Sequence, residues 1–555
     1  MIASALSNLS YRLFRAACRR PLDAQAARLR RILGRAAQSE FGRRHGFARL
    51  ARIADPAALV RGFQEQVPVR AYRDMRAELD DVYAGNWRRL CPSPPIFFTM
   101  TAGSTGQFKY VPVTEEYRRE VGRSSMIFSG ALEACYPAVR RLEAQFLVGS
   151  AEGGRSPGGV PQGFASGFNY KNLPGIVRSR FVLPYWVFTI DDADERSYAA
   201  GRILVEHQKL GVLVAISPVN LINLRRALDQ HAERLCGDLA SGTLTVRGTA
   251  AVPGSYRGRP DPVRSRALHA AWEKTGTLPT TLLFPSLQVL VCWQGGNMSY
   301  YLHEMDEAFG QRQHFEFPIS ASEGVFAVPC RANQAGGTLA ITSHFLEFLP
   351  DAPDGSSSAQ ALRADQLDVG AEYRVVVTNS SGFYRYDMED IVRVTSLFRR
   401  TPVIQFIAKK DRQVSVSNER LTELDVTLAM QAASHRCDHW LQEFLFVPCS
   451  DRRYRVVVDG AGHGDDEPRR DAVMQALAGE LERQLRAAAK GYDFEREDAL
   501  LEPLQLVVAG EGELKEYLRR WQGERRLPNA QIKPMHLTNE FNAHHAFTAV
   551  KTYAA

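Results

Sequence analysis

Apolar residues recur at helical spacing over roughly the first 90 positions of the chain. Arginine-rich polar faces accompany them, and Pro68 interrupts the pattern within "QVPVRAY". Leu6, Leu9 and Leu13 follow one another at helical intervals, which predicts an amphipathic helix packed on the body of the protein. Attachment of the arginine-rich flank of this helix to a membrane surface is the alternative interpretation.

Short apolar runs of strand type come next, with helical stretches between them. This alternation predicts an α/β body, because each buried strand is followed by a helix that covers it. A further strand, "EYRVVVTN", follows the polar loop "DAPDGSSSA". The earlier runs are "EAQFLVGS" (Glu143 to Ser150), "GVLVAIS" (Gly211 to Ser217) and "LQVLVCW" (Leu287 to Trp293).

Beyond about residue 400 the order of elements changes. Two strands, a helix from about Arg470 that Gly491 ends, another strand and another helix predict a small α+β unit. We therefore expect two domains, residues 1–400 and residues 401–555. The strands are "EFLFVP", "RYRVVVD" and "LQLVVAG", and the helices carry Val473, Leu477, Leu481 and Leu485 in the first and Leu514, Leu518 and Trp521 in the second.

The composition is that of an ordinary globular protein, with 45% apolar and 24% charged residues. The net charge of +7 comes from 69 basic and 62 acidic residues spread along the chain, so we expect no nucleic-acid partner but a preference for anionic substrates. Eight scattered cysteines without C-x-x-C spacing argue against zinc and disulfide frameworks and favour a reducing cytoplasm. No apolar run is long enough for a membrane span, so we expect no stable membrane insertion.

The stretch "FFTMTAGSTGQFKYVPVT" is the first candidate for chemistry. Its glycines free the backbone, its hydroxyl groups add hydrogen-bond donors and its lysine adds a cation, a combination that suits a polyanion. A polar turn between two strands is the alternative. The residues concerned are Thr101, Gly103, Ser104, Thr105, Gly106 and Lys109.

Several familiar catalytic motifs are absent from the sequence. It contains no G-x-x-x-x-G-K-[ST] loop, no G-x-S-x-G elbow and no H-E-x-x-H, since His303-Glu304 lacks the second histidine. The order T-A-G-S-T-G-Q-F-K instead resembles the phosphate loop T-S-G-T-T-G-x-P-K of adenylate-forming enzymes. Ala102 replaces a hydroxyl residue of that loop, and Phe108 replaces its proline.

Later segments resemble further parts of the same superfamily in the same order. In "ISASEGV", Ser322 matches the hydroxyl at the α-phosphate and Glu323 the glutamate that helps to hold magnesium. Ile319 stands where an aromatic residue usually stacks on adenine, and Phe317, two positions earlier on the same side of a strand, is the substitute we expect.

Two more matches complete the predicted nucleotide site. In "GFYRYDMEDIVRV", Asp390 matches the aspartate that accepts hydrogen bonds from both ribose hydroxyls, and Glu389 replaces the usual preceding glycine. An exposed acidic turn of Asp387, Glu389 and Asp390 is the alternative. In "NAQIKPMHL", Lys533 resembles the C-terminal lysine that reaches the adenylation site and neutralises charge between carboxylate and α-phosphate.

Motifs along nearly the whole chain resemble the auxin-responsive Gretchen Hagen three family of acyl-acid amido synthetases, particularly its bacterial members. The resemblance implies a large N-terminal body with α/β layers and a β-barrel part, followed by a small mobile α+β domain. It also implies that ATP and Mg²⁺ activate a carboxylic acid as an acyl-adenylate, which an amine, such as an amino acid, then attacks. The motifs are "FGRRHGF", "FQEQVPVRAYRDM", "FPSLQVLVCWQGGNMSYYLHEM", "ASEG", "YRYDMED" and "NERLTE".

The resemblance also places one wall of an acyl pocket at "CWQGGNMSYY". Trp293, Met298 and Tyr301 are the residues we expect to contact an apolar or aromatic acid, although Trp293 is equally well explained as a core residue. Two alternatives remain: an adenylating acyltransferase with a hydroxyl or thiol acceptor, and a nucleotide-binding scaffold without turnover. The sequence leaves the oligomeric state, the acid and the acceptor open.

Overall fold

A computed structural model describes the chain in two compact units. Unit 1 contains the described residues of Met1–Gln294 and Tyr301–Phe406, and unit 2 those of Gly295–Tyr300, Ile407–Leu527 and Ile532–Ala555. That the chain works as two functional domains divided near residue 400 stays a prediction. The described residues are 2–102, 108–151, 153–173, 175–247, 256–350, 360–410, 413–441, 443–460, 467–524 and 534–555.

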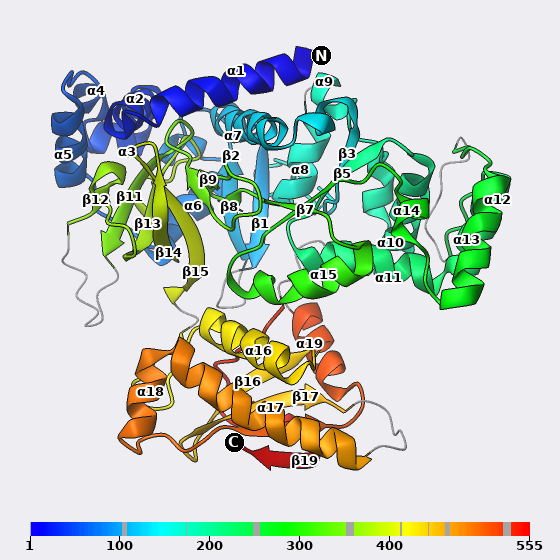
Figure 1. Cartoon of the computed structure of the whole chain (residues 1–555). Helices are drawn as coiled ribbons and strands as arrows, with labels where there is room; N and C mark the ends of the chain where they lie inside the picture. Colours follow the sequence, from blue (N-terminus) through cyan, green and yellow to red (C-terminus); the bar gives the residue numbers. More distant parts are fainter. Residues whose placement is uncertain are drawn as a thin grey trace. The chain divides into compact units, whose positions relative to one another are not determined.

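Helices form the first part of unit 1, as the apolar spacing predicts. Proline at the first turn of α2 and of α5 starts these helices, and the Asp55 carboxylate caps α5 by accepting from the Ala58 amide. A longer helix, α7 (Glu115–Cys135), follows later in the chain and lies along α1 (Figure 1). The early helices are α1 (Ile2–Ala17), α2 (Pro21–Ala36), α3 (Glu40–Arg44), α4 (Phe47–Leu50), α5 (Pro56–Gln66) and α6 (Tyr72–Tyr83).

The orientation of α1 differs from our prediction. Tyr11 and Phe14 are buried, whereas Leu6, Leu9 and Leu13 are exposed to 48%, 53% and 63%. The helix carries two apolar stripes at the same periodicity, and the larger aromatic side chains occupy the packed face. Helical spacing alone could not tell which stripe faces the body, and the prediction that the leucines do so was wrong.

A parallel sheet forms the α/β layer of unit 1. Its strand order is β3-β5-β6-β7, and each neighbouring pair is parallel. Every residue of β5 and β6 is buried, which explains why these strands are continuous apolar runs in the sequence. The strands are β3 (Glu143–Phe146), β5 (Leu210–Val214), β6 (Val289–Cys292) and β7 (Gln313–Glu316), and the connecting helices include α10 (Ala193–Glu206), α11 (Pro218–Gln230), α12 (Ala232–Ser241), α13 (Pro262–Thr275), α14 (Thr280–Leu283) and α15 (Leu302–Phe309).

A second sheet of unit 1 contains eight strands in the order β12-β11-β13-β14-β15-β10-β9-β8. That this sheet forms the barrel part implied by the family resemblance stays a prediction. Its inner side chains share one apolar core with the early helices and with the parallel sheet. The strands are β8 (Ile319–Ala321), β9 (Gly324–Val328), β10 (Gly337–Leu339), β11 (Phe345–Pro350), β12 (Leu362–Arg363), β13 (Glu372–Thr378), β14 (Tyr386–Phe398) and β15 (Thr401–Lys409).

Unit 2 is an α+β unit, as the sequence predicts, with a four-stranded sheet in the order β16-β17-β18-β19. Gly491 does not end the long helix, which stops at Ala488; it lies inside the next helix, where a Cβ would come within 2.5 Å of the Glu419 carbonyl oxygen. None of the described helices in either unit is long and apolar enough to cross a membrane. The elements of unit 2 are α16 (Glu423–Cys437), β16 (Phe444–Cys449), β17 (Arg453–Asp459), α17 (Glu467–Ala488), α18 (Lys490–Glu497), β18 (Gln505–Ala509), α19 (Glu513–Glu524) and β19 (Ala549–Ala554).

Candidate active site

The predicted phosphate loop connects two antiparallel strands, β1 (Phe97–Ala102) and β2 (Phe108–Val113). Thr101 lies opposite Lys109 in the strand register, so the two ends of the loop are cross-strand neighbours. The polyanion-binding role of the segment between these strands stays a prediction. Gly103, Ser104, Thr105 and Gly106 lie outside the described residues.

Lys109 lies beside a pair of tyrosines. Its Nζ atom is 5.1 Å from the centre of the Tyr72 ring, and the Tyr110 amide donates a hydrogen bond of 2.9 Å to the Tyr72 hydroxyl. The Tyr72 ring in turn meets the Tyr386 ring edge-on, with 6.4 Å between centres. The Tyr72 ring thus lies between Lys109 and Tyr386, the first residue of β14.

The charge of Glu323 acts on both tyrosines, and that of Asp390 acts on Tyr386. Burial raises the pKa of Tyr386 well above its ordinary value, and the charges of Glu323 and Asp390 raise it further. Burial also raises the pKa of Tyr72 to about 12, with a smaller contribution from Glu323. The charge of Glu323 therefore bears on both rings and that of Asp390 on Tyr386, while Lys109 lies over Tyr72; a nucleotide site shared by the three residues stays a prediction.

Glu323 lies in the turn between β8 and β9, and three side chains hold the backbone of this turn. The Tyr117 hydroxyl donates to the Ser322 carbonyl oxygen at 2.6 Å, and Asn379 Nδ2 donates to the Glu323 carbonyl oxygen at 2.7 Å. On the other side, His344 Nε2 accepts from the Val325 amide at 3.2 Å. We call Tyr117, His344 and Asn379 the turn cradle. It fixes the backbone that presents Ser322 and Glu323.

A buried carboxylate, that of Glu120, holds His344 of the turn cradle in place. Glu120 is 1% exposed, and it accepts from His344 Nδ1 at 3.0 Å and from the Ser380 amide at 3.3 Å. It also pairs with the Arg28 guanidinium. Burial disfavours the ionised carboxyl, but the His344 hydrogen bond and the Arg28 charge outweigh it and hold the pKa of Glu120 below its ordinary value. Because His344 Nδ1 donates to Glu120, its Nε2 is left to accept from Val325.

Sequence reasoning missed the turn cradle and Glu120. Their residue types are common, and Tyr117 is separated from Ser322 by 205 positions. Gly324 is the residue of the sequence that could have pointed to the turn cradle, because a Cβ there would lie 2.9 Å from His344 Nε2. A glycine directly after the matched Ser-Glu pair therefore indicates a side chain packed against the turn.

Asp390 lies at an irregular part of β14. The register between β13 and β14 shifts between Arg374 and Val376, which marks a bulge opposite residues 388–390. Glu389 adopts a φ of 59° in the left-handed region, which explains physically why a glycine is common at this place in the superfamily. The alternative of an exposed acidic turn is wrong, because Asp387 is 8% exposed and its carboxylate accepts from Arg374 Nη1 at 2.6 Å.

Phe317 does not share a strand with Ile319, contrary to our prediction. Strand β7 ends at Glu316 and β8 begins at Ile319, so Phe317 lies in the connection, where Pro318 follows it. Its ring centre is 5.4 Å from that of Phe146 and 6.4 Å from that of Trp293. Phe317 therefore belongs to an aromatic cluster at the edge of the parallel sheet, and its role as an adenine platform stays a prediction.

The structure describes the surroundings of each of the three predicted acyl-pocket residues. The Trp293 indole donates to the Pro318 carbonyl oxygen at 3.1 Å, while Met298 and Tyr301 are 3% and 5% exposed. Trp293 and Tyr301 belong to unit 1, and Met298 belongs to unit 2. Lys533 lies outside the described residues. A pocket formed by the three residues and a catalytic role of Lys533 stay predictions.

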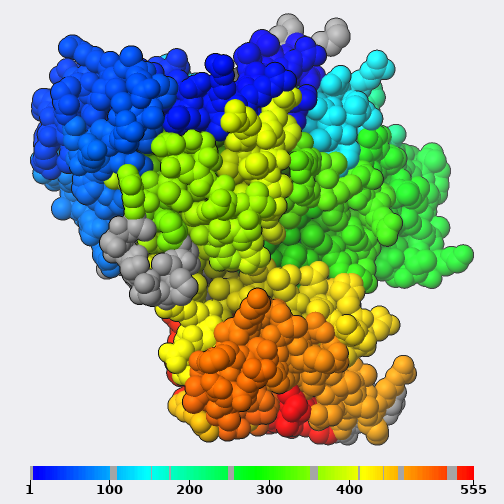
Figure 2. All heavy atoms as spheres, turned by 60° about the vertical axis from the view of Figure 1, so that its left-hand side comes forward, coloured from blue at the N-terminus to red at the C-terminus, as the bar shows by residue number. Residues whose placement is uncertain are grey.

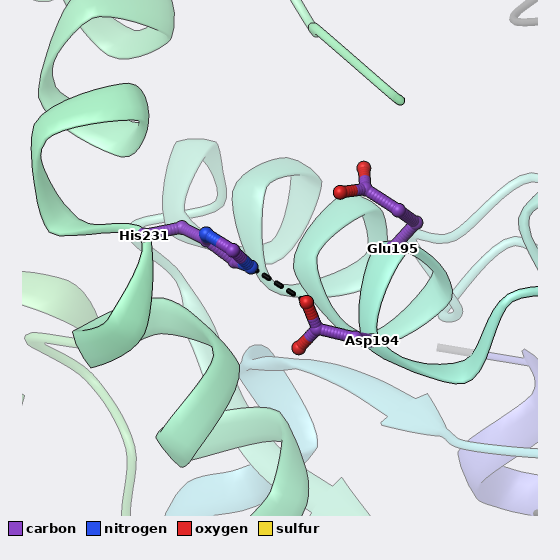
Figure 3. A group of neighbouring side chains, drawn as sticks. All are labelled: Asp194, Glu195 and His231. Atoms are coloured by element: carbon purple, nitrogen blue, oxygen red, sulfur yellow. Dashed lines mark hydrogen bonds and ion pairs between the residues drawn. The ribbon is translucent and has the colours of Figure 1, made fainter. Parts of the chain in front are cut away.

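Asp194, Glu195 and His231 form a separate group whose ligand atoms are close enough to share a metal ion (Figure 3). Their hydrogen bonds and ion pairs already account for the cluster. Asp194 pairs with His231 Nε2 at 2.7 Å, and Glu195 accepts from Arg234 at 2.8 Å and from the Arg247 amide at 2.8 Å. A guanidinium on the carboxylate opposes a second cation there. We therefore interpret this group as a structural ion-pair cluster.

Comparison with known proteins identifies first the fold and then the family. The fold is shared with 2-hydroxyisobutyryl-CoA ligase in the postadenylation state, with a TM-score of 0.53 and 11% identity over 90% of this chain and 91% of that one. It is shared more fully with the acyl acid amido synthetase AtGH3.15 in complex with 2,4-DB, with a TM-score of 0.84 and 20% identity over 100% and 98% of the two chains. The chain therefore has the fold of these two ligases.

The chain belongs to the GH3 family. The model of the GH3 family N-terminal domain matches residues 10–314, and that of the central domain matches residues 337–409. Indole-3-acetic acid-amido synthetase GH3.6 of Arabidopsis thaliana is 25% identical over 448 residues, 74% of this chain and 71% of the relative. Indole-3-acetic acid-amido synthetase GH3.2 of the same plant is 24% identical over 67% of this chain and 72% of the relative. The resemblance to this family stated from the sequence is thereby confirmed, whereas the particular likeness to its bacterial members stays a prediction.

Proposed function

We propose that the protein is an ATP-dependent ligase that activates a carboxylic acid as an acyl-adenylate and transfers the acyl group to an amine. Membership of the GH3 family supports the reaction class, since its named relatives are acid-amido synthetases. The observation that supports the proposal in this chain is that Lys109 lies over the Tyr72 ring, which meets the Tyr386 ring edge-on, and that the charges of Glu323 and Asp390 raise the pKa of Tyr386. One cation and two separated carboxylates match the phosphate, metal and ribose ends of a nucleotide.

Each residue has a distinct task in the proposed site. Lys109 binds the phosphates together with the loop that precedes it. The hydrogen-bond donors of this loop come from Thr101, Gly103, Ser104, Thr105 and Gly106. Ser322 contacts the α-phosphate region, and the Asp390 carboxylate accepts from the two ribose hydroxyls. Glu323 holds Mg²⁺. Its hard carboxylate oxygens fit this ion, which would offset charge on the departing pyrophosphate.

The second half-reaction requires the acyl-adenylate to meet an amine. We place Lys533 as the residue that neutralises charge while the adenylate forms, with residues 401–555 moving between the two half-reactions. Trp293, Met298 and Tyr301 contact the acid, which we expect to be apolar or aromatic. An amino acid is the acceptor we favour, and a cytoplasmic location suits both substrates.

Acid-dependent release of pyrophosphate tests the proposal. Purified protein with ATP and Mg²⁺ is screened against a panel of acids, and products formed with mixed amino acids, alcohols and coenzyme A are identified by mass spectrometry. We expect pyrophosphate release that depends on one class of acid and a new amide. An ester or thioester would instead reveal a different acceptor. ATP binding without any acid-dependent release would indicate the scaffold alternative.

Matched variants test the assignments within the site. Asp390→Asn should raise the KM for ATP about thirtyfold, because a charged acceptor is worth about 2 kcal/mol. Glu323→Gln should shift the Mg²⁺ dependence of pyrophosphate release to higher concentrations. Glu307→Gln, whose side chain is 67% exposed on α15, is the control and should change neither. Unchanged kinetics in Asp390→Asn would remove this residue from the site.

A further inference from the structure

The outward face of α1 is an exposed leucine stripe. Leu6, Leu9 and Leu13 recur along this face, opposite the side on which Tyr11 and Phe14 pack into unit 1. Figure 2 shows the dark blue atoms of this helix at the surface. An isolated exposed leucine needs no explanation, but an aligned row on one helix face does, because it leaves a continuous apolar strip in contact with water.

Arginines flank this stripe, and the helix itself carries no acidic residue. The chain contains no aspartate or glutamate from Met1 to Leu22, whereas Arg12, Arg15 and Arg19 follow one another along one side of the helix end and are exposed. Basic side chains beside an apolar stripe are the pattern of helices that lie in a membrane interface. The arrangement is the one that the sequence offered as the alternative interpretation of this helix.

The turn between β14 and β15 adds a further arginine beside those of α1. The Arg400 amide donates to the Cys18 carbonyl oxygen at 3.1 Å, which fixes the turn between β14 and β15 beside the end of α1. Arg399 from this turn joins Arg12, Arg15 and Arg19 around a surface depression of about 260 Å³. Arginines from two elements thus converge on one depression next to the leucine stripe, and guanidinium groups are the preferred partners of phosphate.

We propose that α1 docks unit 1 on an anionic lipid surface. The leucine stripe enters the boundary between headgroups and acyl chains, while the arginine depression receives lipid phosphates. Charge favours this occupant over a second copy of the chain, because two α1 helices would bring together arginines with no acidic residue on either helix. This docking is independent of the proposed ligase chemistry and requires no membrane-spanning segment.

Vesicle co-sedimentation of the full chain tests the proposal. We expect binding to vesicles of equal parts phosphatidylcholine and phosphatidylglycerol, no binding to phosphatidylcholine alone, and weakening as sodium chloride is raised. Leu9→Gln with Leu13→Gln should reduce the affinity about tenfold, because glutamine keeps the helix propensity and removes apolar contact. Arg15→Gln with Arg19→Gln should reduce it to a similar extent and weaken the salt dependence.

The control variant is Val263→Gln on α13, which removes another exposed apolar side chain of unit 1. It should bind vesicles like the unchanged protein. Thermal unfolding of each variant and its acid-dependent pyrophosphate release should stay unchanged, which separates docking from folding and from the reaction. Failure of the unchanged protein to bind anionic vesicles would overturn the proposal. So would binding that the leucine variant retains in full, or a concentration-dependent dimer that the same variant abolishes.

Discussion

At the scale of a single residue, Tyr117 makes two separate contacts. Its hydroxyl donates to the Ser322 carbonyl oxygen, and its ring stacks on His344 with 5.8 Å between centres. The turn that carries Glu323 is thus held by a hydrogen bond whose donor belongs to α7, the helix that follows the predicted phosphate loop. A change at Tyr117 therefore acts on Glu323 through the backbone without touching its carboxylate.

We predict that Tyr117→Phe raises the KM for ATP about three- to tenfold while costing only about 1 kcal/mol of stability, the usual net worth of one hydrogen bond. Phenylalanine keeps the stack on His344, so the packing is preserved. Initial rates of pyrophosphate release and urea unfolding measure the two effects. Tyr136→Phe is the matched control, because its hydroxyl donates to the His314 carbonyl oxygen at 2.9 Å, away from the turn. Equal KM changes in both variants would contradict the role of the turn cradle.

At the scale of elements, strands were more predictable than helix orientation. β5 and β6 are fully buried, so their sequences are uninterrupted apolar runs and identify them directly. The packed face of α1 was not predictable, because both of its stripes have helical spacing and only the partner helix decides between them. The prediction that Phe317 shares a strand with Ile319 was wrong for a similar reason. The break between β7 and β8 contains only Phe317 and Pro318, and apolar spacing does not reveal so short a break.

The candidate site likewise contains residues that the sequence predicts and residues that it does not. Ser322, Glu323 and Asp390 could be proposed from the sequence because an ordered motif marks each of them. Glu120, His344 and Asn379 were not found, because a buried hydrogen-bond network between distant segments leaves no local pattern. The left-handed φ of Glu389 likewise became interpretable only with the backbone in hand. Motif order thus selects candidate residues, and the structure supplies the hydrogen bonds that hold the turn between β8 and β9.

Two glycines of α7 test how closely α1 approaches it. At Gly130 a Cβ would come within 2.3 Å of the Ser7 carbonyl oxygen, whereas at Gly122 nothing lies within 4 Å. We predict that Gly130→Ala destabilises the protein by about 1–3 kcal/mol, because the backbone of α1 must move. Gly122→Ala should instead stabilise it by about 0.5–1 kcal/mol through helix propensity.

Urea unfolding measures both variants, and limited proteolysis near residue 20 reports whether α1 has loosened. Gly130→Ala alone should become more sensitive to the protease. Stabilisation by both substitutions would show that α1 does not contact α7 as closely as the structure indicates. Because both changes lie on one helix and differ only in their neighbour, helix propensity cancels from the comparison.

At the scale of the whole molecule, the two units contain buried titratable groups of opposite kind. In unit 1, burial raises the pKa of Glu316 to about 8, and the amides of Gly336 and Gln294 offset this only in part. In unit 2, burial lowers the pKa of His536 to about 4. Each group prefers its neutral form in the folded protein. Acidification therefore affects the two units differently.

The sign of each effect follows from proton binding. Between its ordinary pKa and about 8, Glu316 binds a proton more tightly in the folded state, so the stability of unit 1 rises by about 3 kcal/mol as the pH falls from 8 to 5. His536 binds a proton more tightly in the unfolded state below its ordinary pKa, so unit 2 loses about 2 kcal/mol by pH 5.

We therefore predict that the unfolding transitions of the two units move in opposite directions between pH 8 and pH 5. Differential scanning calorimetry measures both, and two variants assign them. Glu316→Gln keeps a neutral side chain at every pH and should flatten the response of unit 1 alone, whereas His536→Gln should flatten that of unit 2 alone. Glu307→Gln, exposed on α15, should leave both slopes unchanged. If both transitions shifted in the same direction, or either slope survived its own substitution, Glu316 and His536 would not be the groups that set the response to pH.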